Sequence, residues 1–282
     1  MTDPVIEAEG LGLRYRRRGG AWALKDCTFT LPAGRVVAVV GPNGAGKTTL
    51  LALAARLLRP TEGRIETPTR DRLAYVAQDK PLYGQLTVAE TLELGRRLNP
   101  DRWDPAAAER VLAAAPPAPD ARVRSLSGGR RSRLALALAL GKRPDVLLLD
   151  EPMADLDPLA RRELMGALMA DAAERGTTVV MSSHILTELE GACDHLLLVQ
   201  DGRIRLTGAI DDLLSAHTLL SGPVADLAPH TVVESRTTGR QLTALIRRQG
   251  PVEGPWETRD PSLEDLLLAH LRAPRPREGA SA

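Results

Sequence analysis

The sequence predicts an α/β fold with a mainly parallel sheet, because short apolar runs alternate with segments of helical composition. The four runs are "RVVAVVG" (35–41), "DVLLLDE" (145–151), "TTVVMSS" (177–183) and "HLLLVQDG" (195–202). A strand that is buried on both faces needs no alternation with polar residues, so runs of this kind are typical of parallel sheets.

Two earlier segments have a different pattern. "VIEAEGLGLRY" (5–15) and "ALKDCTFTL" (23–31) alternate apolar and polar residues. This alternation is typical of strands with one face in the core and one in solvent. We therefore expect an antiparallel β subdomain beside the parallel sheet.

A helical insertion is expected over about 84–140. "TVAETLELGRRL" and "DPAAAERVLAAA" open with Thr87 and Asp104, which are favourable N-cap residues, and "PPAP" (116–119) is a break. "LALALAL" (134–140) alternates like a strand. Its residues are nevertheless strong helix formers with no β-branched side chain, so we predict a helix there.

The main domain is expected over 1–210, with a small C-terminal extension over 211–282. Most of the extension has no clear period. "PSLEDLLLAHLRA" (261–273) predicts one helix, in which Ser262 is the N-cap and Asp265 completes a capping box. The end of the chain, about 274–282, is rich in Pro and small residues, and we expect it to be disordered.

Composition excludes several classes of protein. The chain has 282 residues, 43% of them hydrophobic, a net charge of +1 and two cysteines without metal-ligand spacing. No nucleic acid partner, disulfide scaffold or zinc site is expected from these values. No signal peptide is expected from "MTDPVIEAEG" (1–10), and no apolar run approaches the roughly 18 residues of a membrane helix. Work at a membrane would therefore need a partner.

The strongest motif is "GPNGAGKTT", which matches G-x-x-x-x-G-K-[ST] between an apolar strand and a helical segment. Glycines let the backbone N–H groups converge on phosphate oxygens, and Lys47 would bind the β- and γ-phosphates of a nucleotide. Thr48 would ligate Mg²⁺. The alternative is an incidental glycine-rich turn. The expected nucleotide-binding residues here are Gly41, Pro42, Asn43, Gly44, Ala45, Gly46, Lys47, Thr48 and Thr49.

Two carboxylates end the apolar strand "VLLLDE". Asp150 would hold Mg²⁺, and Glu151 would polarise the water that attacks the nucleotide. Acidic residues at the end of a strand also serve as helix caps, and this remains the alternative.

Six motifs in order carry a family resemblance: "GPNGAGKTT" (41–49), "YVAQ" (75–78), "LSGG" (126–129), "VLLLDEP" (146–152), "DLDP" (155–158) and "SSH" (182–184). From about Val5 to Ile210 the chain resembles the ATP-binding subunits of ABC transporters. The resemblance implies a P-loop NTPase fold with a RecA-like core, ATP and Mg²⁺ as cofactors, and ATPase activity.

The resemblance also implies roles for single residues. Tyr15 would stack on adenine, Gln78 would contact Mg²⁺ or the attacking water, and His184 would contact the γ-phosphate. Asp157 would lie at a contact between subunits. Tyr15 as an ordinary strand residue, and Gln78 and His184 as capping or surface groups, remain the alternatives.

Subunits of this family pair head to tail, as a homodimer or with a related subunit. Ser127, Gly128 and Gly129 of one subunit would then close over the ATP that is held by the other, with helix N-terminal N–H groups aimed at the γ-phosphate. Arg130 departs from the family pattern, which usually has Gln there. We expect function to survive, because Ser127 and both glycines are present.

Two segments, "LNPDRWDPAAAERVL" (98–112) and "PSLEDLLLAHL" (261–271), are similar to subunits of ABC-2 type exporters. This resemblance implies a separate integral membrane permease and a place on the cytoplasmic face of the cell membrane. Residues 78–86 would meet the permease or form ordinary solvent-exposed surface. The alternative functions are a soluble ABC ATPase that acts on ribosomes or DNA, and a regulatory protein without ATPase activity.

Overall fold

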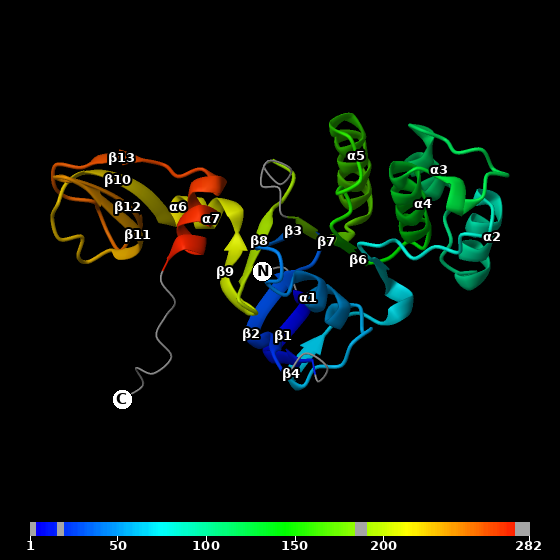
Figure 1. Cartoon of the computed structure of the whole chain (residues 1–282), viewed down its shortest axis with the longest axis horizontal. Coiled ribbons are helices and arrows are strands. Elements are labelled where there is room, and N and C mark those ends of the chain that lie inside the picture. Colours follow the sequence, from blue (N-terminus) through cyan, green and yellow to red (C-terminus); the bar gives the residue numbers. More distant parts are fainter. Residues whose placement is uncertain (1–3, 16–19, 184–190, 274–282) are drawn as a thin grey trace. The chain divides into compact units, whose positions relative to one another are not determined.

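The computed structural model describes residues 4–15, 20–183 and 191–273 (Figure 1). The chain forms two compact units, Met1–Ile204 and Arg205–Ala282. The expected disorder of 274–282 and the position of His184 lie outside the described residues. Each unit is described by itself.

The strands β5-β6-β7-β3-β8, in this order, form the centre of the first unit, and the next strand of the same sheet, β9, contains the boundary between the units. Neighbouring strands from β5 to β8 are parallel, and every residue of β3, β6 and β7 is buried. The predicted parallel sheet is therefore confirmed. The strands are β3 (Val36–Val40), β5 (Leu73–Val76), β6 (Val146–Asp150), β7 (Thr178–Ser183), β8 (His195–Gln200) and β9 (Arg203–Ala209).

The antiparallel subdomain is also confirmed. Strand β1 (Pro4–Arg14) pairs with β2 (Trp22–Pro32) on one side and β4 (Glu62–Glu66) on the other. Helix α1 (Lys47–Ala54) contacts β2, β4 and β6. Apolar side chains from these elements and from β3 form one continuous core, which holds the start of α1 beside the end of β3.

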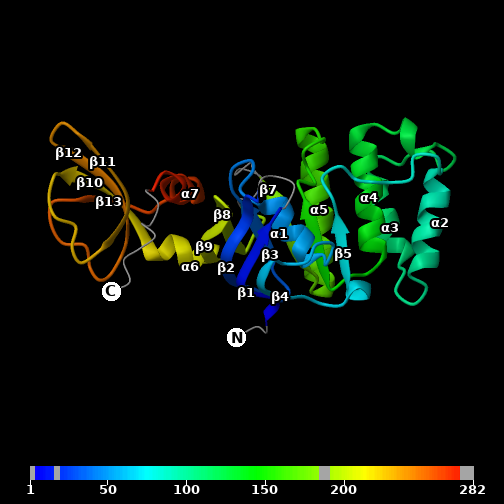
Figure 2. The ribbon, with the colours of Figure 1, turned by 60° about the horizontal axis from the view of Figure 1, so that its bottom comes forward.

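The predicted helical insertion contains α2 (Val88–Leu98), α3 (Pro105–Ala113) and α4 (Gly128–Gly141), and α5 (Pro158–Arg175) follows β6. Figure 2 shows α2, α3 and α4 on the side of β5 and α5. Thr87 caps α2 with a capping box, and Asp104 caps α3, as predicted. The "LALALAL" run lies inside α4, which confirms the helix.

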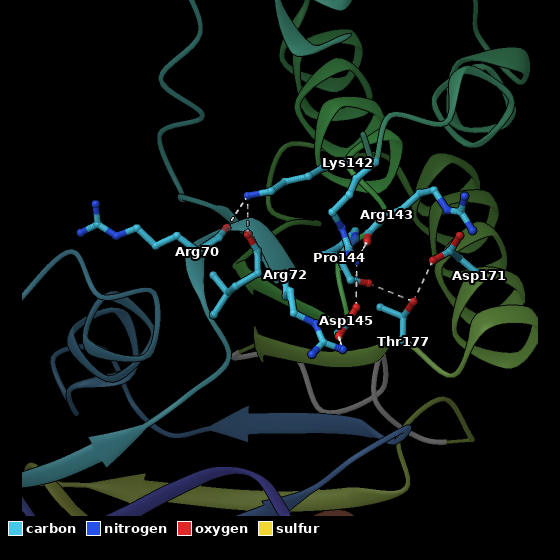
Figure 3. A network of polar contacts seen from close by, with 10 residues as sticks. Arg70, Arg72, Lys142, Arg143, Pro144, Asp145, Asp171 and Thr177 are labelled. Atoms are coloured by element: carbon cyan, nitrogen blue, oxygen red, sulfur yellow. Dashed lines mark hydrogen bonds and ion pairs between the residues drawn. The ribbon is translucent and has the colours of Figure 1, made fainter. Parts of the chain in front are cut away.

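Polar contacts fix the starts of β5, β6 and β7 to one another (Figure 3). The Lys142 ammonium, just after α4, donates to the backbone carbonyls of Arg70 and Leu73 at 2.6 and 2.8 Å. The Asp145 carboxylate pairs with the Arg72 guanidinium, and the backbone N–H of Asp145 donates to the backbone carbonyl of Arg72. These contacts lie at the N-terminal ends of the strands, whereas the sequence motifs that carry Gln78 and Asp150 lie at or beyond their C-terminal ends.

The second unit contains a four-stranded antiparallel sheet that the sequence did not reveal. Its strand order is β11-β12-β10-β13, and the buried core of α7 packs with residues of β12. Strand β11 is mostly exposed, so it has no apolar period. The Ser262–Asp265 capping box of α7 is confirmed. The elements are α6 (Ile210–Ala216), β10 (His217–Pro223), β11 (Thr231–Thr238), β12 (Gln241–Arg247), β13 (Glu257–Arg259) and α7 (Leu263–Arg272).

Two histidines of this unit lie against each other. The rings of His217 and His270 meet edge to face with centroids 5.7 Å apart. Burial, followed by the positive charge of His217 and Arg205, lowers the pKa of His270 to about 4. The unfolded chain binds a proton at His270 below about pH 6.5, whereas the folded unit resists it until about pH 4.

We therefore expect the free energy of unfolding of the second unit to decrease as the pH falls from about 6.5 to 4. Urea unfolding of the full chain, followed by tryptophan fluorescence at pH 7.5 and 5.0, measures this change. His270→Gln should weaken the pH dependence, whereas His230→Gln should leave it. An equal pH dependence in wild type and His270→Gln would contradict the assignment.

Candidate functional site

A cleft of about 430 Å³ lies at the ends of β3, β5 and β6. Strand ends reach it together because β3, β6 and β7 are parallel and in register: Val40 is opposite Ser183, and Asp150 is opposite Ser182. The described residues that line it are Tyr15, Ala21, Trp22, Ala23, Asn43, Gly44, Gly46, Lys47, Thr48, Thr49, Gln78 and Glu151.

Glycines are required where the loop from β3 to α1 passes close to other backbone. Gly41 and Gly46 have φ values of 155° and 111°, which favour glycine. A Cβ on Gly41 would lie 2.0 Å from the carbonyl oxygen of Val199, and one on Gly46 would lie 2.6 Å from that of Ala23. Helix α1 begins at Lys47 without a side-chain cap, so its first N–H groups remain available to an anion.

Lys47 is folded back over this loop and is only 6% exposed. Its ammonium donates to the carbonyl oxygens of Gly41 at 2.7 Å and Pro42 at 3.2 Å. Burial lowers the pKa of Lys47, and the carboxylates of Glu151 and Asp150 oppose this shift. The cation is therefore already positioned at the mouth of the loop.

The carboxylate of Asp150 is 1% exposed. Its Oδ1 accepts a hydrogen bond from the Ser182 hydroxyl at 2.7 Å, whereas Oδ2 has no partner among the described residues. The same hydroxyl accepts from the backbone N–H of Glu151 at 2.9 Å. A buried carboxylate oxygen without a hydrogen bond is costly unless a ligand completes it, and carboxylate oxygen suits a hard cation such as Mg²⁺.

Sequence reasoning did not identify Ser182. It ends the apolar run "TTVVMSS", and its role depends on β7 lying next to β6, which no local pattern specifies. A polar residue at the end of a buried strand, at the edge where the acids lie, was the available signal.

Gln78 and Tyr15 enter the cleft from two other loops. The Gln78 amide donates to the Glu151 carboxylate at 3.3 Å. The hydroxyl of Tyr15 lies 3.4 Å from that of Thr49, and its ring packs against the core of the unit. Tyr15 therefore lies at the rim of the cleft, beside Trp22.

The described residues that line this cleft do not include residues 127–130. Ser127 is the N-cap of α4, where its hydroxyl accepts from the backbone N–H of Arg130 at 3.4 Å. Ser127, Gly128, Gly129 and Asp157 line a separate depression of about 560 Å³. The structure thus separates the predicted site residues into two groups on one chain.

Among the described residues, no group of three or more His, Cys, Asp or Glu side chains could hold a metal ion. No helix in the described part of the chain is long and apolar enough to cross a membrane.

The family model described as "ABC transporter" matches residues 24–154. A second model, described as an AAA domain and putative AbiEii toxin of a type IV TA system, matches residues 119–190. The chain is similar to known proteins over most of its length. It is 34% identical to an uncharacterised ABC transporter ATP-binding protein of Nostoc sp., over 76% of this chain and 69% of that protein.

Two further relatives carry names of import systems. The phosphonates import ATP-binding protein of Rhodopseudomonas palustris is 32% identical, over 88% of this chain and 99% of the relative. The molybdenum import ATP-binding protein of Mycobacterium tuberculosis is 35% identical over 68% of this chain, which spans only 58% of that relative's length.

Two solved structures share the fold. A dimeric bacterial ABC transporter cassette is 25% identical with a TM-score of 0.65, over 73% of this chain and 98% of that chain. A bacterial Atm1-family ABC exporter with ATP bound is 30% identical with a TM-score of 0.65, over 76% of this chain and 40% of that chain. Together with the P-loop and the paired acids at the strand ends, these matches show that the chain belongs to the family of ABC transporter ATP-binding proteins and is an ABC-type ATPase.

Proposed function

We propose that this ATPase drives a separate integral membrane permease from the cytoplasmic face of the cell membrane, and that the complex is an exporter of the ABC-2 type. The observation that carries the ATP-hydrolysing part is the cleft, which holds an uncapped helix start and the buried Lys47. Directly before Glu151 in its lining, Asp150 has a buried carboxylate oxygen without a partner among the described residues. Each of these groups needs a charged ligand of the kind that Mg²⁺ and a nucleotide triphosphate supply.

In the proposed complex, the loop 41–49 surrounds the phosphates with its backbone N–H groups. Lys47 exchanges its two carbonyl partners for oxygens of the β- and γ-phosphates, since a charge-assisted bond to phosphate is the stronger one. Tyr15 stacks on adenine from the rim of the cleft.

Mg²⁺ fits the oxygen atoms that the cleft and the adjoining end of β6 offer. The hydroxyl of Thr48, Oδ2 of Asp150 and the amide oxygen of Gln78 are the proposed protein ligands, and all three are oxygen donors. The bound ion would neutralise charge on the phosphate oxygens. Ser182 orients the Asp150 carboxylate by holding its other oxygen.

Glu151 is the proposed base for hydrolysis. Water would attack the γ-phosphorus, the bond to the β-phosphate oxygen would break, and the proton of the water would move to the Glu151 carboxylate. The backbone N–H of Glu151 is held by Ser182 and its side chain by Gln78, so the base has a fixed position. His184, outside the described residues, is the proposed contact to the γ-phosphate.

A second subunit is proposed to complete the site. Ser127, Gly128 and Gly129 lie in the depression with Asp157, apart from Lys47. Head-to-tail pairing would place these residues over the ATP that is bound by the other subunit. The dimeric form of a cassette with this fold supports the pairing of two subunits. Both a homodimer and a heterodimer with a related subunit satisfy the proposed arrangement.

The proposed permease contact is a groove of about 380 Å³ beside the loop that contains Gln78. Leu73, Tyr75, Pro81, Leu82 and Leu138 contribute its apolar lining. The export direction rests on the two segments similar to ABC-2 exporters, "LNPDRWDPAAAERVL" and "PSLEDLLLAHL".

Lys47→Ala should weaken ATP binding by about 100-fold, because the charge-assisted contacts to two phosphates are lost. A fluorescent ATP analogue titrated into the full chain measures the Kd. Lys25→Ala removes a lysine outside the lining of the cleft and is the matched control. An unchanged Kd for Lys47→Ala would contradict the phosphate cradle.

Ser127→Ala should lower ATP turnover about tenfold or more while leaving the Kd for ATP within about twofold, since its target lies in the other subunit. Mixing Ser127→Ala with Lys47→Ala provides the control. In a mixed dimer one site combines the intact Lys47 of the first chain with the intact Ser127 of the second, so turnover should recover. Absence of recovery in a verified mixed dimer would argue against the trans arrangement.

Glu151→Gln should bind ATP but hydrolyse it very slowly, and so accumulate as a closed dimer. A tagged copy in native cells, purified from gently solubilised membranes with ATP, should retain a polytopic membrane protein. Lys47→Ala is the control that cannot close. Recovery of only ribosomes or DNA-associated proteins would favour the soluble ABC ATPase, and an extracytoplasmic solute-binding protein would favour import.

A further inference from the structure

Lys80 and Asp155 form an ion pair that the catalytic roles above do not use. The ammonium of Lys80 lies 2.5 Å from Oδ2 of Asp155. Lys80 is only 4% exposed, whereas the side chain of Asp155 is 54% exposed. A buried ammonium is costly without a partner, so this lysine depends on the aspartate much more than the reverse.

The pair joins the same two loops as the contact between Gln78 and Glu151. Lys80 follows Gln78 by two residues in the loop after β5, and Asp155 follows Glu151 by four in the segment after β6. The loops are therefore connected twice, once by an amide and a carboxylate at 3.3 Å and once by the ion pair. Neither Lys80 nor Asp155 is among the described residues that line the ATP cleft.

The loop conformation shows that Lys80 is held in place. Its φ is 45°, in the left-handed region that a residue with a Cβ rarely adopts. Its backbone N–H donates to the carbonyl of Ala77 at 3.0 Å, and its carbonyl accepts from the N–H of Leu82 at 2.8 Å. A tight turn thus directs the side chain of Lys80 into the protein.

The two ends of the pair lie at different surfaces. Lys80 lines the apolar groove beside Leu82 and Leu138. Asp155 lines the depression of Ser127–Gly129, and a Cβ built on Gly128 would lie 3.2 Å from the Cβ of Asp155. A single ion pair therefore connects the groove, the loop that carries Glu151 and the start of α4.

We propose that Lys80 and Asp155 are positioning residues for ATP hydrolysis. Their ion pair holds the loop after β6 against the loop after β5, so that Gln78 stays aligned with Glu151 and Gly128 keeps its place at the face that closes over ATP. Occupation of the groove beside Lys80 then acts on turnover through this pair. The inference rests on the proposed function, because it concerns the same hydrolysis site.

The different burial of the two partners predicts unequal effects of substitution. Asp155→Asn leaves the buried ammonium without its counter-charge and should displace both loops, with kcat about tenfold lower or more. Lys80→Met keeps the apolar stem and leaves a carboxylate that water can solvate, so kcat should fall only about threefold. Lys80→Met should therefore suppress the defect of Asp155→Asn in the double variant.

The experiment measures kcat, KM and the Kd for ATP in the full chain, together with the thermal unfolding temperature. The Kd should stay within about twofold in all three variants, since Lys47 and its loop are untouched. Asp155→Glu should recover part of the kcat, because it restores the charge. Arg102→Met is the matched control: it breaks an ion pair with Asp145 at the other end of β6 and should change stability without changing kcat.

Three results would overturn the proposal. One is a wild-type kcat in Asp155→Asn; another is independent, multiplying losses in the double variant. The third is a loss of kcat that follows the unfolding temperature equally in Asp155→Asn and Arg102→Met. Glu151→Gln in the same assay separates the two proposals. Suppose that the wild type hydrolyses ATP, that Glu151→Gln does not, and that the variants of Lys80 and Asp155 keep the wild-type kcat. The positioning role of the ion pair would then be wrong, and the proposed hydrolysis site would stand. An inactive wild type would overturn both.

Discussion

The register of three buried parallel strands determines where the polar groups of the cleft lie. Val40, Asp150 and Ser183 end β3, β6 and β7 at one edge of the sheet. The glycine-rich loop, the acids and Ser182 meet there because β3, β6 and β7 are parallel and end at nearly the same level of the sheet. Contacts around Lys142 and Asp145 fix the opposite ends. A shift of one strand would separate Asp150 from Ser182 and leave both of its oxygens without a partner.

The sequence was sufficient for elements whose signals are local. Continuous apolar runs marked the buried strands, and Thr87, Asp104 and Ser262 marked three helix starts by side-chain capping. The sheet of the second unit was missed because β11 is mostly exposed and therefore has no apolar pattern. Its pairing with β12 is a contact between two segments, which the residues of one segment alone do not reveal. Burial against a distant strand overrides local pattern in such elements.

The candidate site divides in the same way. The glycine-rich loop and the two acids are each a continuous motif in the sequence. In the structure Gly44, Lys47 and Glu151 line one cleft, and Asp150 directly precedes Glu151 at the end of β6. The roles of Ser182 and of the Lys80–Asp155 pair depend on segments that lie far apart in the chain and meet only in the fold. The assigned contacts of Tyr15, Ser127 and His184 with ATP stay predictions, as does that of Gln78 with Mg²⁺ or the attacking water.

In the proposed dimer, the small side chain of Ser127 would serve two partners at once. As the cap of α4 its oxygen accepts from the backbone N–H of Arg130, which leaves its own hydroxyl proton available to donate. Aspartate caps a helix as well as serine does, but it would bring a negative charge toward a phosphate. Alanine would offer neither function. Among the good capping residues, a neutral hydroxyl therefore suits a helix start that must remain attractive to an anion.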